Sequence, residues 1–82
     1  MKLTTDQRKL LDETVLAIVR DATQALRFGE VDSRTRRQIV DRLEGDWSFR
    51  FTDGALQRLR KAGLLKTAHQ RWSAVPQKDP PP

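Results

Sequence analysis

The first third of the chain carries apolar residues at helical spacing. Between Thr4 and Leu26 they recur every three or four positions and form one stripe, made of Leu11, Val15, Ile18, Val19, Ala22, Ala25 and Leu26. Thr4 and Gln7 have the spacing of a capping box, in which each side chain bonds the other residue's backbone N–H. Gly29 follows where a left-handed C-cap is common. The pattern predicts a helix over Thr4–Leu26.

A shorter amphipathic segment follows this helix. Its inward-facing residues are Ile39, Val40 and Leu43. Asp32 or Ser33 is a suitable N-cap before the segment, and Gly45 is a suitable end after it. The pattern predicts a second helix over Arg34–Glu44.

Three aromatic residues at alternate positions come next, namely Trp47, Phe49 and Phe51. A period of two fits a short strand. It equally fits an aromatic plug that seats a loop on the core. The plug is the preferred interpretation, because a core this small needs large aromatic side chains.

The pattern then predicts a third helix over residues 53–62, capped by Thr52 or Asp53 and ended by Gly63. Its buried face consists of Ala55, Leu56, Leu59 and Ala62. Gly54, Gln57 and Lys61 fall on the opposite face.

Two brief apolar segments, Leu64–Thr67 and Arg71–Val75, are candidate strands around a tight turn at residues 68–70. Residues 76–82 hold all four prolines and no large apolar residue, so we expect a disordered tail there. The expected fold class is mainly α with a small β-hairpin. One domain would occupy residues 1–75.

Charge is distributed unevenly along the chain. The 82 residues carry a formal net charge of +5, and this whole excess lies after residue 30, since acidic and basic residues balance before it. Between Asp53 and Asp79 there is no acidic residue. A helix and a hairpin of one charge sign are typical of a surface that meets a polyanion.

The residues of the second half resemble a known family. The run Ala55-Leu56-x-x-Leu59-x-x-x-Gly63-Leu64-Leu65, followed by Trp72, resembles the recognition helix and wing of winged helix-turn-helix DNA-binding domains. The resemblance implies a transcriptional regulator that places its third helix in the major groove of double-stranded DNA and a short wing, residues 66–72, on the backbone.

The resemblance also assigns positions to individual residues. Groove-facing positions fall on Gly54, Gln57, Arg58 and Lys61, where Gln57 suits adenine and the cations suit guanine. Phosphate positions fall on Arg50, Arg60 and Lys66, and the wing tip comprises His69, Gln70 and Arg71. Arg34, Arg36 and Arg37, near the predicted start of the second helix, are either further phosphate contacts or a solvated polar face.

Other interpretations stay open. Asp53 carries a negative charge where phosphate would approach; it is a helix cap, a contact to cytosine, or a sign of a protein partner. A protein-interaction module would bind an acidic partner through the basic face and could use Trp47 as an exposed anchor. Single-stranded nucleic acid would require all three aromatics on the surface. Leu10 and Leu16 lie off the first helix's stripe and offer a contact for a homodimer.

Several classes of function lack a sequence signal. The chain has no cysteine, and His69 is its only histidine, with no neighbouring metal ligands. No set of residues resembles a catalytic site, so we expect no enzyme, no cofactor, no metal and no small-molecule ligand. No apolar run approaches the ~20 residues of a membrane span, and no secretory signal is present, so a cytoplasmic location is expected.

Overall fold

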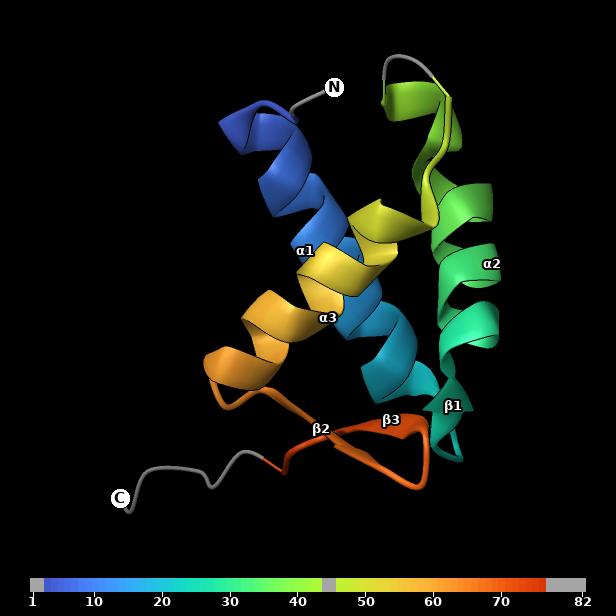
Figure 1. The fold of residues 1–82 in the computed structure, drawn as a ribbon, viewed down its shortest axis with the longest axis vertical. Coiled ribbons are helices and arrows are strands. Elements are labelled where there is room, and N and C mark those ends of the chain that lie inside the picture. The colour runs from blue at the N-terminus through green and yellow to red at the C-terminus, as the bar shows by residue number, and fades with distance from the viewer. Residues whose placement is uncertain (1–2, 44–45, 77–82) are drawn as a thin grey trace.

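The computed structural model describes residues 3–43 and 46–76 (Figure 1). Within them the chain forms, in order, α1 (Thr5–Asp21), β1 (Leu26–Arg27), α2 (Phe28–Ile39), the 3-10 turn η1 (Val40–Arg42), α3 (Phe49–Lys61), β2 (Leu65–Ala68) and β3 (Arg71–Ala74). Helix α3 crosses α1 and also contacts α2, and the sheet closes one end of the three helices. The predicted class, mainly α with a small β-hairpin, is confirmed, and β1 adds a third strand to the hairpin that was not predicted.

Helix α1 begins as predicted and ends earlier. The capping box is present, because the Gln7 N–H donates to Thr4 Oγ1 at 3.1 Å and the Thr4 N–H donates to Gln7 Oε1 at 2.9 Å. The predicted extension to Leu26 is wrong: the helix ends at Asp21, and Leu26 lies in β1 opposite Trp72. Leu26 is buried from a strand, so the pairing with β3 overrides the helical period of the local sequence.

Helix α2 begins earlier than predicted, at Phe28, directly after β1. Asp32 and Ser33 therefore lie inside the helix, and the predicted cap is wrong. The N-cap residue is Arg27, which makes no side-chain capping hydrogen bond, so the end of the β1 pairing sets the start of the helix. Gly29 consequently belongs to α2 and does not cap α1.

Helix α3 also begins earlier, at Phe49, with Ser48 as its N-cap. The predicted cap at Thr52 or Asp53 is wrong. Thr52 is fully buried, and its hydroxyl donates to Asp32 Oδ1 at 2.7 Å across the α2–α3 contact. Asp53 is exposed in the helix. Thr52 is thus used to join two helices and is not available as a cap.

The aromatic segment forms a plug in part. Trp47 and Phe51 are half-buried against the core, with ring centroids 5.5 Å apart at 87°. The Trp47 indole Nε1 donates to Asp32 Oδ1 at 3.0 Å. Phe49 departs from the prediction: it is 61% exposed, with its ring edge-on to Phe28. Its position in the first turn of α3 points it away from the core.

The core lies between the three helices and one face of the sheet. Fully or almost fully buried apolar side chains include Leu11, Val15, Val19, Val31, Leu56, Leu65 and Trp72. Leu10 and Leu16, the off-stripe leucines, are half-buried and pack on this core within the same chain. They therefore leave only part of their surface for any second copy.

The hairpin matches the predicted strands to within one residue. Strands β2 and β3 pair antiparallel with Leu65 opposite Ala74, and β1 adds to the other edge of β3. His69 and Gln70 connect the two strands with φ of 52° and 63°. Positive φ at both central residues is characteristic of a type I′ turn, whose backbone twist matches the twist of the two strands that it joins.

Gly63 is expected to be the glycine that the fold needs most. It ends α3 with φ of +79°, and a Cβ there would meet no atom within 4 Å, so the cost of alanine is a backbone cost alone. Gly63→Ala should lower the free energy of unfolding by roughly 1–2 kcal/mol, measured by urea titration with circular dichroism.

Gly29→Ala is the matched control. Gly29 lies in α2 and is exposed, and a Cβ at this position would likewise meet no atom within 4 Å. Alanine should therefore raise the free energy of unfolding by about 0.5–1 kcal/mol. Equal changes of one sign in both variants would contradict the left-handed C-cap.

Candidate nucleic-acid interface

One face of α3 is turned away from the core. Thr52, Ala55, Leu56 and Leu59 are buried on the inner side. The opposite side, called here the free face of α3, consists of Arg50, Asp53, Gly54, Gln57 and Lys61. Arg50, Asp53 and Lys61 are exposed there, and Gly54 and Gln57 are half-buried. Residues three or four positions apart share a helix face, so these side chains form one stripe along α3.

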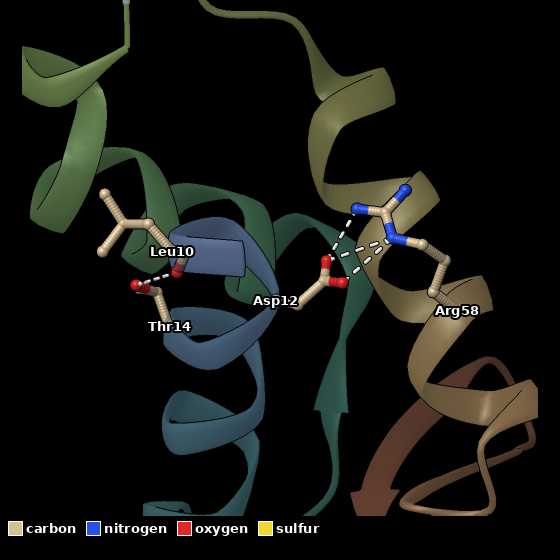
Figure 2. A network of polar contacts seen from close by, with 4 residues as sticks. All are labelled: Leu10, Asp12, Thr14 and Arg58. Atoms are coloured by element: carbon tan, nitrogen blue, oxygen red, sulfur yellow. Dashed lines mark hydrogen bonds and ion pairs between the residues drawn. The ribbon is translucent and has the colours of Figure 1, made fainter. Parts of the chain in front are cut away.

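The structure places Arg58 differently from the other predicted groove residues. Its guanidinium forms two parallel bonds to Asp12 of α1, with Nη2 to Oδ1 at 2.6 Å and Nε to Oδ2 at 3.0 Å (Figure 2). The side chains are 39% and 25% exposed, so the pair lies at the edge of the α1–α3 contact. A bidentate pair of this kind fixes orientation as well as charge. Arg58 therefore links two helices.

Gly54 makes room for Arg58. A Cβ on Gly54 would lie 3.1 Å from Arg58 Nη1, tighter than ordinary van der Waals contact. The Arg58 side chain thus leans over Gly54, and the glycine accommodates this guanidinium. Nη1 is the one guanidinium nitrogen of Arg58 that does not donate to Asp12.

The charge on and beside the free face is mixed. Arg50 and Lys61 lie on it, exposed Arg60 flanks it, and Asp53 contributes one carboxylate. Asp53 is not the helix cap, so the first of its three interpretations is excluded. A positive surface with one acidic side chain remains.

The three predicted arginines of α2 do not join this face as one group. They lie in the middle and last turn of α2 and not near its start, so the predicted contact through the helix N-terminus is wrong. Asp32 lies on the side of α2 that faces α3, because its carboxylate accepts a hydrogen bond from Thr52 of α3. Each residue of a helix is rotated by about 100° from the one before it, so Arg36, four positions later, lies close to the same side. Arg34 and Arg37 lie on the far side, where they line a cavity of about 350 Å³ with Asp21 of α1.

The predicted wing residues Lys66, His69, Gln70 and Arg71 are all exposed, as a wing requires. Arg71 and Arg34 line one cavity of about 310 Å³ near the α1–β1 connection. Of the predicted residues, Arg34 and Arg71 thus lie together between α2 and β3, whereas those of the free face lie on α3.

Sequence reasoning missed Arg8. It lines a cavity of about 530 Å³ between α1 and α3, with Leu3, Leu11, Arg50, Phe51 and Arg58. Asp46 and Ser48 lie at the same cavity. Arg8 stands four positions before Asp12 on α1, and this spacing was the available signal that both point towards one side of the helix.

The part of the chain that the structure describes offers little for other chemistry. No group of three or more His, Asp or Glu residues there is arranged to hold a metal ion. None of the described helices has the length and apolar character needed to cross a bilayer. The chain matches no protein-family model, no curated protein and no solved structure.

Proposed function

We propose that this protein is a small DNA-binding protein, a transcriptional regulator of winged helix-turn-helix architecture, that places α3 in the major groove. The observation that carries the proposal is the free face of α3. A helix packed on the core along one side displays a stripe of polar and cationic side chains along the other. An α-helix with its side chains is about 10–12 Å across, which suits a major groove roughly 12 Å wide.

The order of elements supports the same architecture. Three helices precede a two-stranded hairpin, and the hairpin turn is exposed with His69 and Gln70 at its tip. In helix-turn-helix proteins the recognition helix reads base edges while neighbouring elements contact phosphates. Gln57 then faces adenine, Lys61 faces guanine, and Asp53 accepts from a cytosine amino group.

Titration of a fluorescent random-sequence duplex at several salt concentrations tests the proposal. If about five phosphates are neutralised, log affinity should fall with log salt at a slope of about −4 to −5. Arg60→Ala removes an exposed predicted phosphate contact, so it should weaken binding and make the slope about one unit shallower. Arg20→Ala removes one exposed charge from the last turn of α1 and is the matched control. A flat salt response of the wild type would contradict duplex binding.

A second function has one observation in its favour. Phe49 is 61% exposed next to the half-buried Phe28, and an exposed aromatic is a typical anchor for a protein partner. Trp47 is not this anchor, because its indole is half-buried and bonded to Asp32. In this alternative the basic face binds an acidic protein. Phe49→Ala would then abolish partner binding and leave duplex binding intact.

A further inference from the structure

The cavity of about 530 Å³ between α1 and α3 is lined by three arginines. Arg8 comes from α1, and Arg50 and Arg58 come from α3. Two acidic residues lie near these arginines: Asp46 lines the cavity, and Asp12 is paired with Arg58. Three positive and two negative charges leave the cluster with a formal net charge of about +1. Among the described residues, only Arg58 of the three forms an ion pair. Arg8 and Arg50 therefore line the cavity without an ion pair among the described residues, and Asp46 is the acidic residue of the lining.

Arg58 is held ready for an anion. Asp12 accepts hydrogen bonds from Arg58 Nε and Nη2 (Figure 2). Nη1 is left beside Gly54. A guanidinium already fixed by a carboxylate loses less side-chain entropy when it takes a further partner. The first turn of α3 adds to this environment, since it contains no acidic residue and carries the positive end of the helix dipole.

We propose that this cavity is a phosphate-binding site in which Arg8, Arg50 and Arg58 receive one phosphate group, with Asp12 as the positioning residue for Arg58. Arginine forks match phosphate oxygens in geometry as well as charge. Arg50 belongs both to this cavity and to the free face of α3. A DNA strand that borders the groove occupied by α3 therefore passes the cavity, and a backbone phosphate is the occupant. The identity of this occupant rests on the proposed function.

The test uses two probes on the full chain. The first is the duplex titration at several salt concentrations with wild type, Arg8→Ala, Arg8→Lys and the control Arg20→Ala. Arg8→Ala should make the salt slope shallower by about one unit, so that a fourfold rise in salt weakens the variant roughly three- to fourfold less than the wild type. Arg8→Lys and Arg20→Ala should both keep a slope near that of the wild type. Arg8 is exposed, so its variants should fold like the wild type, and a thermal melt of each variant checks this.

The second probe is inorganic phosphate, followed by the side-chain N–H signals of the arginines in nuclear magnetic resonance. The Arg58 and Arg50 signals should shift in the wild type and stay unmoved in Arg8→Ala. Duplex binding with an unchanged slope in Arg8→Ala and no phosphate response overturns the site and leaves the proposed function standing. Phosphate shifts without duplex binding keep the site and overturn the proposed function.

Discussion

Leu56→Ala should remove most of the protein's free energy of unfolding. Leu56 is fully buried in the middle of α3, and leucine-to-alanine changes in cores cost about 2–5 kcal/mol. A domain of 82 residues has a total stability of about 5 kcal/mol, at the low end of the usual range. Leu56→Ala therefore removes a large part of the free energy that keeps the domain folded. Circular dichroism during urea titration should show a midpoint shifted far to low urea, or no folded baseline.

Phe49→Ala is the control for this prediction. The phenylalanine ring is larger than the leucine side chain and stands in the same helix, but 61% of the residue is exposed. Its removal should change the free energy of unfolding by less than about 1 kcal/mol, because little apolar surface returns to water. Similar midpoints for Leu56→Ala and Phe49→Ala would contradict the orientation of α3 on the core.

The helices could be predicted from the sequence, and so could the start of α1 and the end of α3, but the other helix ends could not. Apolar spacing is a local signal, so it correctly indicated the presence of each helix and the buried side of α3, except for Ala62, which is exposed at the C-cap. Those other ends depend on partners far along the chain. Leu26 leaves the helical pattern because it pairs with Trp72, and this pairing also sets where α2 begins. Threonine is a common N-cap residue, yet the Thr52 hydroxyl donates a hydrogen bond to Asp32 and does not cap α3.

The same division applies to the candidate site. The free face of α3 follows from the buried face by helix geometry alone, so Gly54, Gln57 and Lys61 lie where the pattern placed them. Arg58 has an acidic partner 46 positions away, which no local pattern reveals. Arg8 entered the site for the same reason, since α1 meets α3 only in the folded chain. Side chains at helix contacts are thus the least predictable part of a site.

Asp32→Ala is expected to have the second-largest effect. One oxygen, Asp32 Oδ1, accepts from Trp47 Nε1 at 3.0 Å and from Thr52 Oγ1 at 2.7 Å. Alanine leaves the fully buried Thr52 hydroxyl without this acceptor and removes two bonds to a charged group. The expected loss is about 2–4 kcal/mol in the free energy of unfolding. In a Trp72→Phe background, Trp47 emission should also shift to the red.

Asp32→Asn and Thr52→Val separate the two contributions. Asparagine keeps an acceptor oxygen at the same place, so it should cost less than alanine, about 1 kcal/mol. Thr52→Val removes the buried hydroxyl that alanine at position 32 would leave unsatisfied. Asp32→Ala should therefore cost less in the Thr52→Val background than in the wild type, because residues in one hydrogen-bond network are not additive. Strictly additive urea midpoints would show that Asp32 does not connect α2 to α3 through Thr52.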